Sequence, residues 1–280
     1  MAAIGYSTTA IFVKLAYIGG MKPLPLVTLR FFLSAWLMFF YLFFTKKINI
    51  SQIPSKLIQL GIPGFLGYGG AAVGFLLSLA YLKAPIASIL LYTYPIFVTI
   101  LSAIFFKETL TFRRILALAI TFSGILFVID VFDQNSLTLA PLGVLFSLIS
   151  ALSYAFFNVY GQKNIKNTPP MLLSFYTLAV GALILPLISN PFYFLNTPHS
   201  FANLGFGLAL AIFCTVLPMI LYFKGLEKVK ASVASIIASF EPVFTVIFAT
   251  LILGDTITSK QIIGGILILI GILVLQSEGK

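Results

Sequence analysis

Long apolar stretches alternate with short polar segments along the whole chain. Ten of them come close to the roughly 20 mostly apolar residues that cross a bilayer as an α-helix. They are residues 1–18, 24–44, 58–82, 86–106, 115–132, 139–161, 171–189, 204–223, 231–253 and 261–276. The pattern predicts an all-α integral membrane protein with ten transmembrane helices and no room for a soluble domain. The first stretch lacks signal-peptide features, so we expect a retained helix there.

The composition supports this prediction and excludes several other classes. Of the 280 residues, 60% are hydrophobic and only 9% are charged, whereas soluble domains carry about 25% charged residues. A cytosolic enzyme, a disordered chain and a nucleic-acid-binding partner are therefore excluded. With one cysteine, Cys214, and one histidine, His199, we expect no disulfide, metal or other cofactor. No glycine loop of the phosphate-binding type points to ATP.

Basic residues predict how the helices are oriented. When the N-terminus is placed in the cytoplasm, the inner segments hold twelve of the seventeen Lys and Arg residues, and the outer segments hold four. Arg30 lies inside the second stretch. Because basic loops stay on the cytoplasmic side, we expect both termini inside. The short loops and the lack of a targeting segment favour a prokaryotic plasma membrane.

The second half of the chain repeats the first. A shift of 147 residues places Lys83–Val128 on Lys230–Leu275 without gaps, and 14 of these 46 positions are identical. The identities include Pro95 with Pro242, and Gly124 with Gly271. Two five-helix repeats are predicted, at 1–132 and 139–276, and an odd number of helices inverts the second. Inverted repeats are typical of secondary transporters, whose substrate site lies near the midplane.

The repeated motifs resemble those of the EamA family in the drug/metabolite transporter superfamily. They are Ala84-Pro-Ile-Ala-Ser, Tyr94-Pro-Ile-Phe, Lys107-Glu-Thr-Leu-Thr and Ser123-Gly, their counterparts Ala231-Ser-Val-Ala-Ser, Glu241-Pro-Val-Phe, Gly254-Asp-Thr-Ile-Thr and Ile270-Gly, and Arg30-Phe. The resemblance covers essentially the whole chain. It implies a 5+5 inverted-repeat fold, a central cavity lined by helices 1, 3, 4, 6, 8 and 9, and export of small metabolites, often amino acids. Lys107 departs from the glycine that the family more often has, which affects only loop geometry.

Glu241 is the foremost candidate for transport chemistry. It lies near the middle of the ninth stretch, where an unpaired charge is costly and ionisable groups are by default functional. A carboxyl group that takes up and releases a proton there is what proton-coupled exchange requires; the alternative is a helix-tying hydrogen bond. Pro95 and Pro242 each remove a helical hydrogen bond, so both predict kinks that face the cavity as hinges or serve packing alone.

Symmetry extends the candidate set to neighbouring tyrosines. Tyr94 aligns with Glu241 and is therefore expected in the cavity, whereas Tyr92 and Ser239 lie about 200° round the helix and are second choices. The sixth stretch adds Tyr154 and Asn158, one turn apart, and Asn158 alternatively ties helices together. The remaining two candidates are Tyr6, and Tyr68 beside a stripe of glycines that we interpret as helix packing.

Other polar residues are interpreted as structural. Arg30 and Lys14 lie off-centre and are expected to snorkel or to bond carbonyls, with contact to a substrate carboxylate as the alternative. Glu108 and Asp255 precede Thr109-x-Thr111 and Thr256-x-Thr258 at the starts of the fifth and tenth helices, a pattern typical of N-cap chemistry.

Three functions remain to be compared. The first is a secondary transporter that exports small amino-acid-like metabolites by alternating access, with or without proton coupling. The second is an importer or exchanger of phosphorylated or nucleotide-linked compounds, which needs several deep cations. The third is a membrane enzyme, structural protein or pore, and the chain shows no catalytic constellation or charged ring. The partners expected are a small-molecule substrate, the lipid bilayer and protons, in a monomer or a dimer.

Overall fold

The computed structural model describes residues 1–82, 84–129, 140–253 and 257–276, and all regular elements among them are helical. Six helices are largely continuous: α3 (Pro23–Phe44), α5 (Ile62–Ser78), α8 (Phe112–Val128), α9 (Pro141–Asn164), α10 (Pro170–Ile184) and α15 (Ser259–Gln276). Four spans consist of two helices each: α1 (Ala2–Ser7) with α2 (Thr9–Ile18), α6 (Ala84–Leu91) with α7 (Tyr94–Phe106), α11 (Ser200–Ala211) with α12 (Leu217–Leu226), and α13 (Ala231–Ala238) with α14 (Glu241–Phe248). A short α4 (Ile53–Lys56) precedes α5. The predicted all-α fold is confirmed.

The surface of these helices suits a lipid environment. Seven of the described helical segments are long and apolar enough to cross a membrane, and Ala2–Ile18 and Ser259–Leu275 are shorter apolar helices. Large apolar side chains face outward: Phe201 is 91% exposed and Leu187 is 83% exposed. Water would not tolerate so many exposed apolar residues, whereas hydrocarbon chains solvate them.

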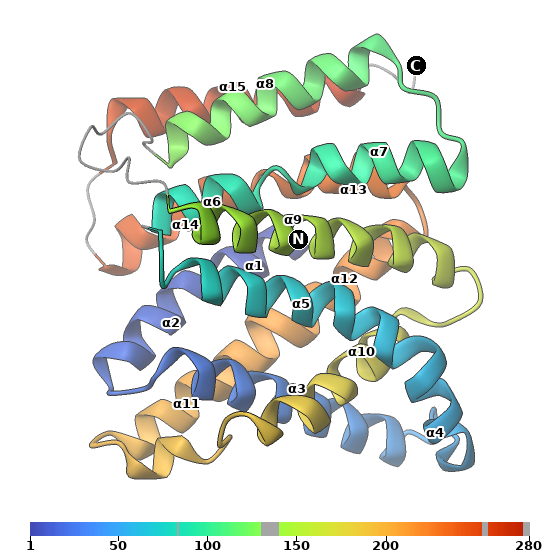
Figure 1. Ribbon diagram of the computed structural model, residues 1–280, viewed down its shortest axis with the longest axis vertical. Coiled ribbons are helices and arrows are strands. Elements are labelled where there is room, and N and C mark those ends of the chain that lie inside the picture. Colours follow the sequence, from blue (N-terminus) through green and yellow to red (C-terminus); the bar gives the residue numbers. More distant parts are fainter. Residues whose placement is uncertain (83, 130–139, 254–256, 277–280) are drawn as a thin grey trace.

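The helices are stacked in layers along the long axis of the molecule (Figure 1). At one edge α8 and α15 lie side by side, and α3 and α11 form the opposite edge. Between these edges α9 packs against both α5 and α7. The largest core cluster centres on buried aromatic residues such as Tyr94, Phe157 and Phe223. The broken spans cross this central region.

Glycines allow helices to approach closely at two places. A Cβ atom on Gly124 would lie 2.7 Å from the Gly264 carbonyl oxygen, so only hydrogen fits between α8 and α15. The glycine stripe of the third span likewise faces its neighbours: Gly67 meets Phe157 and Gly74 meets Ser150, both on α9. Small residues at helix interfaces are the usual means of tight packing in membranes.

The start of α8 has the expected N-cap chemistry, but a threonine supplies it and Glu108 does not. The cap is Thr111, whose hydroxyl accepts a hydrogen bond from the Arg114 backbone N–H at 3.3 Å. Glu108 instead turns inward to form an ion pair, because Lys107 adopts the left-handed conformation (φ 54°) and redirects the chain. Thr258 caps α15 by accepting from the Gln261 N–H. The expected cap residues Asp255 and Thr256 lie outside the described residues.

Candidate functional site

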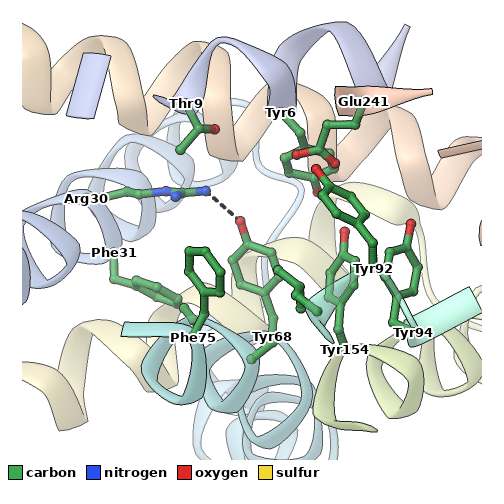
Figure 2. A pocket seen from close by; sticks show the side chains of 13 residues that line it. Tyr6, Thr9, Arg30, Phe31, Tyr68, Phe75, Tyr92, Tyr94, Tyr154 and Glu241 are labelled. Atoms are coloured by element: carbon green, nitrogen blue, oxygen red, sulfur yellow. Dashed lines mark hydrogen bonds between the residues drawn. The ribbon is translucent and has the colours of Figure 1, made fainter. Parts of the chain in front are cut away.

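A cavity of about 170 Å³ lies where the broken spans meet. Its walls come from eight helices and the α6–α7 break, and they combine aromatic rings with one cation and one acid. The lining residues are Tyr6, Thr9, Arg30, Phe31, Tyr68, Ala71, Ala72, Phe75, Leu91, Tyr92, Tyr94, Tyr154 and Glu241. Figure 2 shows Arg30 entering from one side and Glu241 from the other, with Tyr68 between them and the other tyrosines gathered near Glu241.

The two helix breaks position residues of both halves at the cavity. Helix α6 ends at Leu91 and α7 begins at Tyr94, while α13 ends at Ala238 and α14 begins at Glu241. Each new helix has its proline at the second position, where the missing N–H removes no helical hydrogen bond. Tyr94 and Glu241 thus occupy the first position of a half-helix, at the positive end of its dipole.

The break also explains why two tyrosines that were expected to point apart both reach the cavity. In a continuous helix Tyr92 and Tyr94 lie on different faces, but the chain is not helical at residues 92–93. Their rings lie 6.5 Å apart, and the Tyr94 ring meets the Tyr154 ring edge-on at 4.7 Å. The Tyr94 hydroxyl donates to the Ser235 carbonyl at 3.3 Å, which ties α7 to α13.

Arg30 is held firmly at the opposite wall. Its Nη2 donates to the Tyr68 hydroxyl at 2.7 Å and to the Cys214 carbonyl at 2.9 Å, and its Nε donates to Thr215. Within the described part of the chain, Nη1 makes no such bond. The guanidinium is therefore held through two of its nitrogens while Arg30 lines the cavity.

The Glu241 carboxyl has fewer contacts than the Arg30 guanidinium. Its carboxyl interacts with the Tyr92 side chain and lies within electrostatic range of Arg30. Figure 2 shows the Tyr92 hydroxyl beside the Glu241 carboxyl. Among the described residues, no direct ion pair joins Arg30 and Glu241. The two opposite charges thus face one cavity with space between them.

The Tyr6 hydroxyl lacks a hydrogen-bond partner among the described residues. Tyr6 is 7% exposed, and its hydroxyl makes no hydrogen bond. A buried polar group normally finds a partner, and each exception requires an explanation. Because Tyr6 points toward the cavity close to Glu241 (Figure 2), a bound molecule is the natural partner.

The structure brings six of the eight predicted cavity residues together: Tyr6, Tyr68, Tyr92, Tyr94, Tyr154 and Glu241. The other two lie outside the cavity wall. Asn158 donates to the Tyr154 carbonyl at 2.6 Å and accepts from the Tyr222 hydroxyl, so it joins α9 to α12. Ser239 donates to the Ser235 carbonyl at 3.2 Å.

Sequence reasoning missed the position of Arg30. It was interpreted as structural, yet it lines the cavity while also bonding Tyr68. The available signal was its charge inside an apolar span, because such residues usually face the bundle interior. Lys14, which was grouped with Arg30, is exposed and does not line this cavity.

Together, the fold and this cavity define a polytopic membrane protein with a largely aromatic site that contains one cation and one acid. The sequence model of the EamA-like transporter family matches residues 1–130 and 141–276. The chain belongs to this family, and it is a membrane transporter rather than an enzyme.

Several bacterial relatives are similar along most of their length. "Uncharacterized transporter YyaM" of Bacillus subtilis is 27% identical, with 91% of this chain and 85% of the relative covered. "Uncharacterized transporter YoaV" of the same organism is 30% identical, with 89% and 86% covered. The "Probable amino-acid metabolite efflux pump" of Salmonella typhimurium is 26% identical, with 91% and 85% covered.

A solved structure shares the fold at low sequence identity. The structure, "Crystal structure of protein", superposes with a TM-score of 0.78 and 16% identity, and the match covers 98% of this chain and 93% of the other. This likeness extends the fold assignment to essentially the entire chain.

Proposed function

We propose that this transporter exports small zwitterionic, amino-acid-like metabolites by alternating access, in exchange for protons at Glu241. The observation that carries the proposal is the pairing of one cation and one acid across a single cavity. A substrate carboxylate suits Arg30, because guanidinium groups bind carboxylates through fixed donors. A substrate ammonium group suits Glu241, and the unpartnered Tyr6 hydroxyl offers a further hydrogen bond.

The size and walls of the cavity narrow the substrate further. About 170 Å³ is below the 300–1,000 Å³ typical of sites for drug-sized ligands, so a small metabolite fits better than a drug. Tyrosine and phenylalanine rings cover the space between the two charges. Such rings favour an apolar or aromatic side chain on the substrate.

Competition at Glu241 provides the coupling. One carboxyl group binds a proton or a substrate ammonium group, but not both at once. A site that alternates between the two sides of the membrane therefore exchanges substrate for proton, and an inward proton gradient drives substrate outward. We place the protein in the plasma membrane with both termini in the cytoplasm, as the distribution of basic residues predicts.

The phosphorylated-substrate alternative is less well supported. A phosphate ester carries about two negative charges and requires several cations. Among the described lining residues, Arg30 is the cation, and Glu241 repels such a ligand. The Salmonella relative, whose name describes amino-acid metabolite efflux, also favours the zwitterion.

Transport in proteoliposomes tests the proposal with three matched probes. L-phenylalanine carries both charges, phenethylamine lacks the carboxylate and 3-phenylpropionate lacks the ammonium group. We expect pH-gradient-driven transport of L-phenylalanine and little transport of the other two. In Glu241→Gln at equal reconstitution, gradient-driven transport should collapse.

Two results contradict the proposal. Equal transport of all three probes excludes recognition by the two charges. Unchanged gradient-driven transport in Glu241→Gln excludes proton exchange at this residue. Uptake of a sugar phosphate in place of L-phenylalanine favours the alternative.

A further inference from the structure

A buried ion pair lies at the end of the bundle where α7 is connected to α8. The Arg114 Nη1 atom is 3.1 Å from the Glu108 Oε2 atom, and the two side chains are 7% and 3% exposed. Arg114 also donates to the Thr109 carbonyl at 3.3 Å. Removing two charges from water is costly, and such a pair persists only with further hydrogen bonds.

The second half of the chain supplies these hydrogen bonds. The Ser232 hydroxyl, at the start of α13, donates to Glu108 Oε2 at 2.7 Å, and the Gln162 side chain, near the end of α9, donates to Oε1 at 3.2 Å. The Gln162 carbonyl oxygen accepts from the Ala231 backbone N–H. Both carboxylate oxygens of Glu108 are therefore bound by residues from beyond position 140.

This cluster of Glu108, Arg114, Gln162 and Ser232, here called the inter-repeat cluster, has no equivalent in the sequence of the opposite repeat. The 147-residue shift places Gln261 at the position of Arg114 and Pro85 at that of Ser232. At these two aligned positions the opposite repeat therefore has neither a cation nor a hydroxyl.

Helix α13 connects the cluster to the cavity. Ser232 is bound to Glu108 at the beginning of the helix, and Ser235 accepts the Tyr94 hydroxyl one turn later. The helix ends at Ala238, three residues before Glu241. Since α13 is only eight residues long, a displacement at Ser232 is transmitted to the helix break at the cavity.

We propose that the inter-repeat cluster is the gate at this end of the transporter, which the charge distribution predicts to be cytoplasmic. The structure holds it closed, and α13 must part from residues 107–114 before the site opens to that side. The inference rests on the proposed alternating-access function. Opening hydrates both charges, so the lost hydrogen bonds are replaced by water and the gate remains reversible.

A reversible cross-link tests whether the gate must open. In a Cys214→Ala background, Glu108→Cys and Ser232→Cys are combined with Arg114→Gln, which leaves no cation without its partner. The purified protein is treated with a short bis-methanethiosulfonate reagent and reconstituted. We expect L-phenylalanine exchange to be lost on cross-linking and restored by dithiothreitol, while the two single-cysteine controls stay active. Full exchange by fully cross-linked protein overturns the proposal.

A second measurement needs no substrate. In the single-cysteine protein Cys214→Ala/Ser232→Cys, the thiol reacts with N-ethylmaleimide only when the gate opens. Changing Glu108 and Arg114 together to Gln removes both charges and should speed the reaction by roughly tenfold, because charge-assisted hydrogen bonds hold the gate closed. An unchanged labelling rate overturns the proposal that the cluster is a gate. If the labelling rate rises but the reduced double-cysteine protein does not transport L-phenylalanine, the gate proposal is supported and the proposed substrate is wrong.

Discussion

The two helix breaks have similar backbone geometry but differ in the side chain that begins the second half-helix. Each half-helix starts one residue before a proline, but the first residue is Tyr94 in one half and Glu241 in the other. The second charge of the cavity shows the same division: Arg30 lies in the first half, and Thr177 occupies the position 147 residues later. Two similar helix breaks thus contribute to the cavity, and unlike side chains give it a positive and a negative side.

The largest effect is expected when the first break is made like the second. Tyr94→Glu places a carboxylate at a side chain that is 1% exposed, close to Glu241. An unpaired intramembrane charge costs about 3 kcal/mol, and a like charge nearby adds to it. We expect little folded protein by size-exclusion chromatography, whereas Tyr94→Phe should fold. Normal yields of Tyr94→Glu would show that this break is hydrated.

The positive side of the cavity is tested by Arg30. Arg30→Gln should raise the KM for L-phenylalanine by roughly 30-fold or more, because a hydrogen-bonded charge contact is lost. Arg30→Lys keeps the charge but loses the fixed donors, so it should be intermediate. Phenethylamine, which lacks a carboxylate, serves as the control because its weak transport should not change. A parallel loss for both probes would indicate a purely structural arginine.

Tyr6 and Tyr160 are both buried tyrosines, but the Tyr160 hydroxyl donates to the Leu60 carbonyl at 2.6 Å and lies outside the cavity. Tyr6→Phe removes a buried hydroxyl without a partner and should raise stability by about 1 kcal/mol while it weakens L-phenylalanine transport. Tyr160→Phe, the control, should lower stability and leave transport kinetics unchanged; thermal melting and transport assays measure the two effects. A loss of stability in Tyr6→Phe would mean that its hydroxyl has a partner in the membrane.

The smallest effect concerns the loop that precedes the fifth helix of the first half. Lys107 has φ 54°, a conformation that costs non-glycine residues about 1–2 kcal/mol, and its counterpart in the second half is Gly254. Lys107→Gly should raise the melting temperature slightly, since greater freedom in the unfolded state offsets part of the gain. Lys107→Ala, as a control, should not stabilise the protein. A lower melting temperature for Lys107→Gly would show that the lysine side chain has a role.

The sequence was sufficient for the fold because membrane spans are long, local signals. The ten predicted stretches correspond to helices in the structure, and both prolines mark the breaks. Glu241 stood out because it is an acid deep in an apolar span.

Contacts between distant residues were harder to predict. Glu108 looked like a cap because its neighbours in sequence suggested one, whereas its partners Gln162 and Ser232 lie 54 and 124 positions away. Arg30 does bond a carbonyl, as expected, but its place in the cavity wall could not be predicted, since the oxygens that hold it belong to Tyr68, Cys214 and Thr215. The side-chain direction at such positions depends on packing that local patterns do not record.

The glycine contact between α8 and α15 affects how the protein is made. The surface around Gly124 is complete only when Gly264 arrives, about 140 residues later, which at ribosomal speeds of about 5–20 residues per second is roughly 7 to 28 s of synthesis. During that interval the Gly124 face of α8 is in the bilayer without α15, the helix that packs against it. A nascent chain that stops before its last helix therefore exposes this face to the quality-control machinery of the membrane.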